Sequence, residues 1–184
     1  LPSAVLDDIR PAATLNRPGL WRDAFPLTRT DTHKYARGHA IVVGGPAEMT
    51  GAARLGARAA LRIGAGLVTL ASPRAAFPIN AAHLTAVMVR PFDVPEGLVK
   101  FTEDPRIKAL LLGPGATFGA PTRRLVELAL AGNAGVVLDA DALSAFAVDD
   151  DAARSTSPIG FHTSEMSPPT ATPETLFALI AARV

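Results

Sequence analysis

Glycines and carboxylates follow three of the short apolar segments in this sequence. The three loops are Gly44-Gly45-Pro46, Gly113-Pro114-Gly115 and Asp139-Ala140-Asp141. Glycine lets a backbone approach a ligand closely, and a carboxylate accepts hydrogen bonds or binds a hydrated cation. Ligands of open α/β sheets lie outside the carboxyl ends of the strands. These loops are therefore the candidates for binding chemistry.

The two glycine loops differ in how strongly they indicate a ligand. Gly44 and Gly45 precede a predicted helix, whose first N–H groups attract anions, but a tight strand-to-helix turn explains them equally well. Their loop matches neither the Walker A pattern nor G-x-G-x-x-G. Gly113 and Gly115 enclose Pro114 at a strand end, and this flat, rigid loop favours contact with a planar ligand.

Asp139 and Asp141 would point in the same direction if the chain between them stayed extended. One carboxylate would then accept a hydrogen bond from a ribose hydroxyl or hold a hydrated Mg2+ ion, while the other would cap the following helix. For Asp141, capping and ligand contact remain equally open on the sequence alone.

Other groups favour structural explanations. Gly64-Ala65-Gly66 ends a helix and begins a strand. Arg54, Arg58 and Arg62 recur every fourth residue, which is typical of a solvated helix face. The histidines do not have a metal-binding spacing such as H-E-x-x-H, and the sequence contains no cysteine. We therefore predict no metal site built from histidine or cysteine.

Short apolar strands alternate with helices, which predicts a three-layer α/β domain with a mostly parallel sheet. The predicted strands are 40–43, 67–71, 86–89, 109–112 and 136–138, and the predicted helices are 50–63, 123–131 and 142–146. Thr50 is expected to be the N-cap of the first helix. The predicted parts of the chain are a proline-rich linker or docking arm at 1–32, the α/β part at 33–148 and a divergent tail at 149–184.

The composition excludes several functional classes. The 184 residues carry 18 basic and 17 acidic side chains, a net charge of +1, so we expect no nucleic-acid or anionic-membrane partner. No apolar stretch approaches the roughly 18 residues of a membrane-spanning helix. Residues 1–10 do not have the pattern of a signal peptide. We therefore expect a cytoplasmic protein that acts on small molecules.

Six runs of residues occur in the order and approximate spacing of one known family. They are His33-Lys34-Tyr35-Ala36-Arg37-Gly38-His39-Ala40, Val42-Val43-Gly44-Gly45, Met49-Thr50-Gly51-Ala52-Ala53, Gly64-Ala65-Gly66-Leu67-Val68-Thr69, Gly113-Pro114-Gly115 and Asp139-Ala140-Asp141-Ala142-Leu143. Residues 34–146 thereby resemble the ADP-dependent NAD(P)H-hydrate dehydratases. The resemblance implies a ribokinase-like fold and dehydration of the S form of NADH or NADPH hydrate, with ADP or ATP and usually Mg2+.

The resemblance also implies partners and site residues. In many bacteria an epimerase domain precedes this domain, so a fused or separate epimerase is implied, and homo-oligomer formation stays open. Ala40 and Gly115 match positions that contact the hydrated nicotinamide nucleotide. His162 matches the histidine of a Thr-Pro-His-x-Gly-Glu loop, although the Thr-Pro and the Gly of that loop are absent here. The substrate-side candidates are thus Ala40, Gly44, Gly45, Gly113, Gly115, Asp141 and His162.

The nucleotide-binding elements of the family and its general-base aspartate belong beyond Val184. No catalytic residue is therefore named, and we expect a domain whose C-terminal part is missing and that does not by itself regenerate NADH from its hydrate. Two alternatives stay open. One is a ribokinase-like kinase of a small molecule such as a sugar or a vitamin precursor, and the other is a non-catalytic, truncated remnant.

Overall fold

The structure is a computed structural model that describes residues 5, 8–9, 15, 17–25, 31–93, 95–117 and 119–146. The predicted tail and its candidate His162 lie outside the described residues. The chain divides into two compact units, Leu1–Asp31 and Thr32–Val184. The first unit contains a short helix, α2 (Pro18–Trp21), and a 3-10 turn, η1 (Arg22–Ala24). Proline at the start of α2 suits the helix because its φ is already helical.

Five strands of the second unit form one sheet in the order β3-β2-β1-β4-β5. They are β1 (His39–Val43), β2 (Leu67–Pro73), β3 (Met88–Phe92), β4 (Ile107–Leu112) and β5 (Gly135–Leu138). All neighbouring strands are parallel. The helices and 3-10 turns are η2 (Ala47–Met49), α3 (Thr50–Arg62), α4 (Phe77–His83), η3 (Pro95–Leu98), α5 (Val99–Thr102), α6 (Ala120–Ala131) and α7 (Asp141–Ser144).

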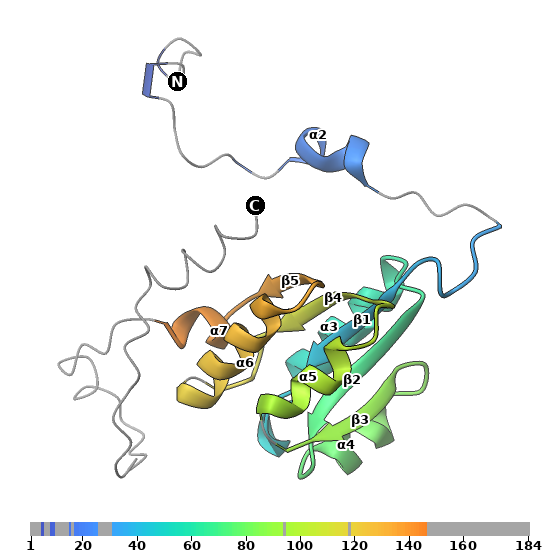
Figure 1. Ribbon diagram of the computed structural model, residues 1–184, viewed down its shortest axis with the longest axis vertical. Helices are drawn as coiled ribbons and strands as arrows, with labels where there is room; N and C mark the ends of the chain where they lie inside the picture. Colours follow the sequence, from blue (N-terminus) through green and yellow to red (C-terminus); the bar gives the residue numbers. More distant parts are fainter. Residues whose placement is uncertain are drawn as a thin grey trace. The chain divides into compact units, whose positions relative to one another are not determined.

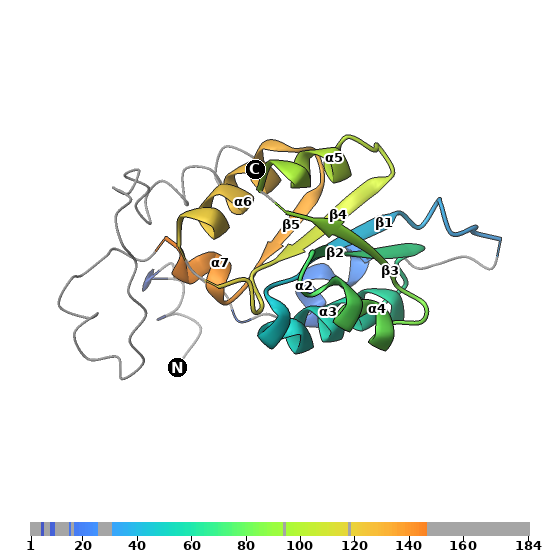
Figure 2. The ribbon, with the colours of Figure 1, turned by 90° about the horizontal axis from the view of Figure 1, so that it is seen from below.

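Helices cover both faces of this sheet. α3 and α4 lie on one face, and α5, α6 and α7 lie on the other (Figures 1 and 2). Alternation along β1 divides the apolar core accordingly: Ile41 and Val43 belong to the cluster that includes α6, whereas Ala40 and Val42 belong to the cluster beneath α3. Each large apolar side chain buried in this way contributes about 1.5–3 kcal/mol. The predicted three-layer architecture is confirmed, and within the described residues the sheet is entirely parallel.

Several predicted element ends differ from the structure, and two of the differences are informative. The third strand occupies Met88–Phe92 and continues through Pro91, because β3 is at an edge of the described sheet and an edge strand tolerates a residue without an N–H group. Thr50 is the first residue of α3 and not its N-cap, a position held by Met49 without a side-chain cap hydrogen bond. No helix among the described residues is long and apolar enough to cross a membrane.

Helices α4 and α5 were not predicted from the sequence. Both are short, and each carries only one buried residue, Asn80 in α4 and Phe101 in α5. A helix can be told from a loop by its sequence pattern only when several apolar residues recur on one face. These helices therefore depend on packing against the sheet that sequence periodicity does not show.

Candidate functional site

The strand order changes direction between β1 and β4. From β1 the chain adds β2 and β3 on one side, and it then returns to place β4 and β5 on the other side of β1. Ligands of open parallel sheets bind outside the carboxyl ends of the strands at this kind of point. The loop after β1 carries Gly44 and Gly45, and the loop after β4 carries Gly113 and Gly115. The structure therefore brings these four candidate glycines together at the switch point.

Gly45 and Gly115 are in direct backbone contact across this point. A Cβ atom on Gly45 would lie 1.5 Å from the carbonyl oxygen of Gly115 and 2.6 Å from its carbonyl carbon. No side chain fits in that space, because real Cβ contacts with backbone do not fall below about 3 Å. Glycine at position 45 is thus required by the packing of the two loops on each other.

The Gly113-Pro114-Gly115-Ala116 segment is a tight turn. The N–H of Ala116 donates to the carbonyl oxygen of Gly113 at 2.9 Å, and Gly115 has φ +70°. Proline followed by a residue with positive φ is the pattern of a type II turn. A Cβ atom on Gly115 would also lie 2.8 Å from the carbonyl oxygen of Met49. The turn thereby rests on the chain between β1 and α3.

The contacts continue on both sides of this pair. The N–H of Gly44 donates to the carbonyl oxygen of Ala71, in the carboxyl-terminal half of β2, at 2.8 Å. Gly113 has φ +129°, and a Cβ atom there would lie 1.7 Å from the carbonyl oxygen of Asp139, after β5. Four strand ends are therefore connected by close backbone contacts, and we call the loops after β1, β4 and β5 the carboxyl-edge loops.

Asp141 connects two carboxyl-edge loops through its side chain. Its Oδ2 accepts a hydrogen bond from the N–H of Thr117 at 2.9 Å. The N-cap of α7 is Ala140, and no side-chain cap hydrogen bond is present there. The capping interpretation of Asp141 is therefore wrong. Sequence reasoning missed Thr117 altogether, since nothing in its neighbourhood indicates a residue with φ +64°.

Asp139 and Asp141 do not continue an extended chain. Ala140 between them has φ +45° and ψ −115°, so the expected alternation that would align the two carboxylates does not apply. Asp139 is exposed, and its Oδ1 accepts from the N–H of Ala140 at 2.8 Å. Among the described residues, no group of three or more His, Asp or Glu side chains is arranged to hold a metal ion.

Ala40 lies apart from the carboxyl-edge loops. It is 9% exposed and belongs to the core cluster beneath α3, near the beginning of β1. At about 3.3 Å per residue, four residues separate it from Gly44 by about 13 Å. The structure thus does not bring Ala40 to the switch point, and its predicted contact with a nucleotide stays a prediction.

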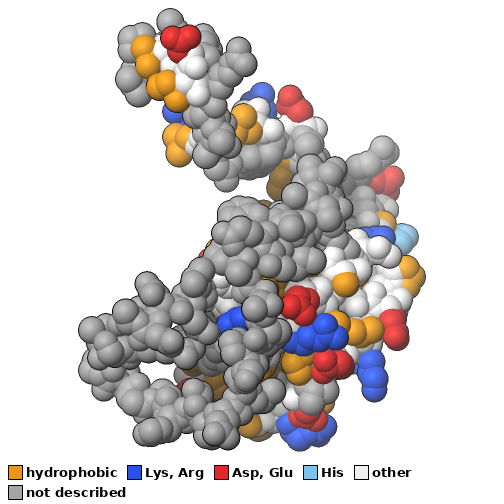
Figure 3. Space-filling model, turned by 60° about the vertical axis from the view of Figure 1, so that its left-hand side comes forward, with side chains coloured by type: hydrophobic (Ala, Val, Ile, Leu, Met, Phe, Trp, Pro, Cys, Tyr) orange, Lys and Arg blue, Asp and Glu red, His pale blue; other side chains and the backbone are white. Residues whose placement is uncertain are grey.

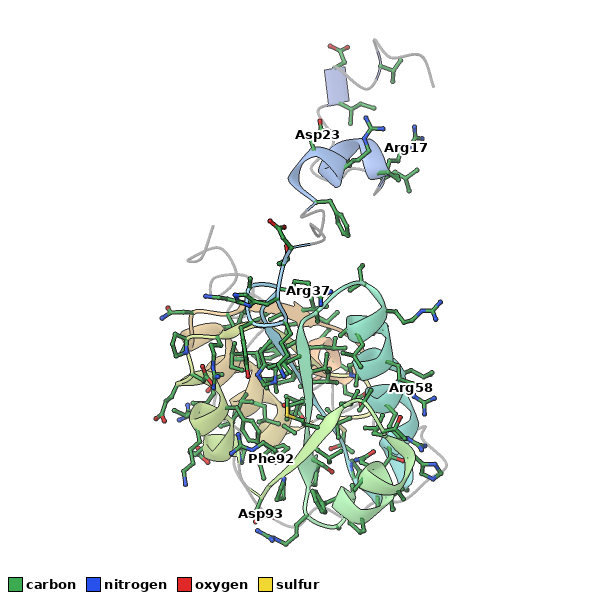
Figure 4. All side chains as sticks on the ribbon, turned by 90° about the vertical axis from the view of Figure 1, so that its right-hand side faces the viewer. Arg17, Asp23, Arg37, Arg58, Phe92 and Asp93 are labelled. Carbon is green, nitrogen blue, oxygen red and sulfur yellow. The ribbon has the colours of Figure 1, made fainter. Side chains whose placement is uncertain are left out.

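One of the three arginines on α3, Arg58, has a structural role. Arg58 projects from the outer side of the helix (Figure 4), and its guanidinium donates to the carbonyl oxygen of His83 at 2.9 Å. This bond satisfies a carbonyl at the end of α4. In the coloured lower right part of Figure 3, acidic and basic side chains lie beside one another. Exposed ion pairs of this kind are Arg74–Asp93 and Arg124–Glu96.

At the opposite, amino end of β1, His39 packs against β2. Its Nε2 lies 2.8 Å from the Oγ1 of the buried Thr69. Burial lowers the pKa of His39, Arg106 and Arg90 lower it further, and Asp104 opposes them. His39 is far from the carboxyl-edge loops along β1, so it serves the fold and not the candidate site.

Comparison with known proteins gives consistent matches. A sequence model of the NAD(P)H-hydrate dehydratase family matches residues 40–161. The bifunctional NAD(P)H-hydrate repair enzyme Nnr of Moorella thermoacetica is 38% identical over 137 residues, which are 70% of this chain and 26% of that protein. The ADP/ATP-dependent NAD(P)H-hydrate dehydratase of Bacillus subtilis, co-crystallised with ATP and Mg2+, is 26% identical, with a TM-score of 0.55 over 64% of this chain and 42% of that chain.

A further solved structure shows the fold alone. It is a ribokinase-like superfamily protein of Enterococcus faecalis, 23% identical, with a TM-score of 0.56 over 66% of this chain and 43% of that chain. The predicted ribokinase-like fold is thereby confirmed. The chain spans about a quarter of the length of the Moorella relative and less than half of the two solved structures.

Proposed function

The chain belongs to the NAD(P)H-hydrate dehydratase family, and on this premise we propose that it acts in the ADP- or ATP-dependent dehydration of the S form of NADH or NADPH hydrate. This reaction would return a damaged nicotinamide nucleotide to the normal cofactor. The observation that carries the proposal is that the family match includes the four switch-point glycines, which the fold assembles where open α/β sheets bind their ligands.

In this proposal the carboxyl-edge loops hold the hydrated nicotinamide nucleotide. Gly44, Gly45, Gly113 and Gly115 let these loops pack closely against neighbouring backbone. Their main chain thereby lies at the switch point, where we propose that the dinucleotide binds. Ala40 and His162 are proposed as further substrate contacts, from the resemblance alone. The chain would contribute by positioning the substrate, which can supply a large part of a rate enhancement.

ADP or ATP is the proposed phosphate donor to the hydroxyl that leaves, and Mg2+ is its proposed companion, as the Bacillus subtilis relative is named ADP/ATP-dependent and was co-crystallised with ATP and Mg2+. Mg2+ typically keeps several waters and needs only one or two protein carboxylates beside phosphate oxygens. The exposed carboxylate of Asp139 is of this chemical kind, and no step of the proposal depends on the ion.

Two further parts of the proposal concern partners and location. The Moorella relative is named bifunctional, which supports an epimerase, fused or separate, that converts the R hydrate into the S hydrate. A cytoplasmic location, expected from the sequence, belongs to the same proposal.

The test separates binding from turnover. The purified 184-residue chain is titrated calorimetrically with the S hydrate of NADPH, and with the R hydrate and unmodified NADPH as controls. We expect the S hydrate to bind more tightly than either control. If the chain does not bind the S hydrate, or binds all three equally, the proposed function is wrong.

Turnover is then followed by the absorbance of reduced nicotinamide after addition of ADP or ATP with Mg2+. Regeneration of NADPH from the S hydrate in this assay would support the proposed function. Phosphorylation of a sugar or vitamin precursor in the same mixture would instead favour the kinase alternative.

A further inference from the structure

We propose that Asp141 is a positioning residue: its carboxylate holds the loop after β4, and thereby Gly115, in the conformation that receives the ligand. The ligand itself would not contact the carboxylate. This inference rests on the proposed function, because the ligand of that loop would be the hydrated nicotinamide nucleotide.

The contact that carries the inference joins two distant segments. Asp141 opens α7 and is half-buried, and its Oδ2 accepts the N–H of Thr117 at 2.9 Å across 24 residues of chain. A hydrogen bond to an ionised acceptor is about twice as strong as one between neutral groups. The bond therefore fixes Thr117 to the first residue of α7.

The backbone on both sides of this bond is strained. Thr117 has φ +64° and Ala140 has φ +45°, and among the described residues they are the non-glycine positions with positive φ. Such conformations are costly for residues with a Cβ atom, above all for a β-branched one, and they persist only where the surroundings hold them. Thr117 donates the hydrogen bond to Asp141, and Ala140 immediately precedes Asp141 in the chain.

Thr117 is also held from the opposite side. The hydroxyl of the buried Thr122, in α6, lies within hydrogen-bonding distance of the carbonyl oxygens of Ala116 and Thr117. The N–H and the carbonyl of Thr117 are thus both engaged. Gly115 stands two residues before Thr117, so its place at the switch point is set by these anchors together with its contact with Gly45.

The alternative role for Asp141 is direct contact with a ribose hydroxyl or a hydrated cation. The two roles make different demands on the side chain. Holding the Thr117 N–H requires an oxygen acceptor, which asparagine retains. A cation requires the negative charge, which asparagine lacks. The substitution D141N therefore separates positioning from charge recognition, and D141A removes both.

The experiment compares wild type, D141N and D141A, with D104N as matched control. Asp104 also accepts a backbone N–H, that of Arg106 at 2.9 Å, but it lies before β4, at the other end of the sheet. Amide hydrogen exchange and the chemical shift of the Thr117 N–H are measured by NMR, and the affinity for the S hydrate of NADPH is measured by calorimetry.

We expect D141A to weaken binding roughly tenfold, the usual effect of a lost hydrogen bond to a charged group, and to accelerate exchange at Thr117 and Gly115. D141N should keep the affinity within about threefold, because its amide oxygen still accepts, while the Thr117 shift moves. D104N should change neither quantity at these residues.

Two results would overturn the inference. If D141N bound the S hydrate as weakly as D141A, the charge itself would be recognised. If the chemical shift of the Thr117 N–H were unchanged in D141N, the bond would not hold the loop. Failure of the wild type to bind the hydrate would count against the proposed function instead, and the exchange rates of Thr117 and Gly115 would still show whether Asp141 fixes this loop.

Discussion

Gly45 lies so close to Gly115 that a Cβ atom on the former would stand 1.5 Å from the carbonyl oxygen of the latter. The two residues belong to the loops after β1 and β4, on either side of the point where the strand order reverses. Because of this contact, a displacement of one loop requires a displacement of the other. Glycine at position 45, which the sequence alone suggests as a ligand contact, is thus already required by the fold.

Substituting Gly45→Ala should destabilise the second unit by about 3 kcal/mol or more, because the new methyl group must displace backbone and not a flexible side chain. The measurement is the free energy of unfolding in urea. Gly51→Ala is the matched control, since a Cβ atom there meets nothing within 4 Å. In α3 it should stabilise by about 0.5 kcal/mol. Equal effects of the two substitutions would refute the close contact.

The sequence predicted the parts of the fold that depend on local pattern. Apolar runs such as 109–112 gave the strands, and Gly113-Pro114-Gly115 marked the end of one of them, where the structure indeed has a tight turn. The contact of Gly45 with Gly115 and the bond between Asp141 and Thr117 could not be predicted. Each joins segments far apart in the chain, and no periodicity encodes which loops meet.

The sequence predicted where the candidate site lies in the fold, but not which of its residues contact one another. Residues at strand ends meet at one edge of a parallel sheet, so the glycine loops were expected there. The backbone of Ala140, with φ +45°, falsified the extended geometry assumed for the two aspartates. Alanine rarely adopts this conformation, so only tertiary contacts can impose it.

Stability should fall at mildly acidic pH because of His39. Burial and the nearby Arg106 and Arg90 lower its pKa from the ordinary 6.5, against Asp104. The folded state therefore favours the neutral ring. Its contribution is present above pH 6.5 and is lost as the pH falls through the lower, folded-state pKa. The urea midpoint of the wild type should decrease over this window.

The control for this pH dependence is the substitution His39→Gln, which cannot titrate and should flatten the curve of the urea midpoint against pH. His83→Gln provides a second control, because the side chain of His83 is exposed at the end of α4. The assignment to His39 would have to be abandoned if H39Q and the wild type lost stability in parallel.

The carboxyl group of Asp104 should titrate well below its usual range. Hydrogen bonds from the side chain and the backbone N–H of Arg106 lower its pKa from 3.8 to about 2. An NMR titration of the side-chain carboxyl carbon measures this value. Arg106→Gln should move it toward 3.8, and Arg62→Gln, in a different part of the molecule, should leave it in place. Because the pair is exposed, high salt should also raise the value.

The buried amide of Asn80 offers a test of how polar groups are tolerated between α4 and β2. Its Nδ2 donates to the Oγ of Ser72 at 2.9 Å, and both residues are fully buried. Its Oδ1 has no hydrogen-bond partner among the described residues. Asn80→Leu should therefore cost little, since it removes the unpaired oxygen and refills the space, whereas Asn80→Ala should cost about 1–3 kcal/mol.

Asn80→Asp should be the most destabilising of the three, because it places a charge at a fully buried position, at a cost of several kcal/mol near neutral pH. Urea unfolding gives the order Leu, Ala, Asp of increasing loss. Asn133→Asp, at an exposed residue before β5, is the matched charge control and should stay within about 0.5 kcal/mol of wild type. A large loss of stability in Asn80→Leu relative to the wild type would contradict the prediction, because removal of the unpaired oxygen would then not offset loss of the Ser72 bond.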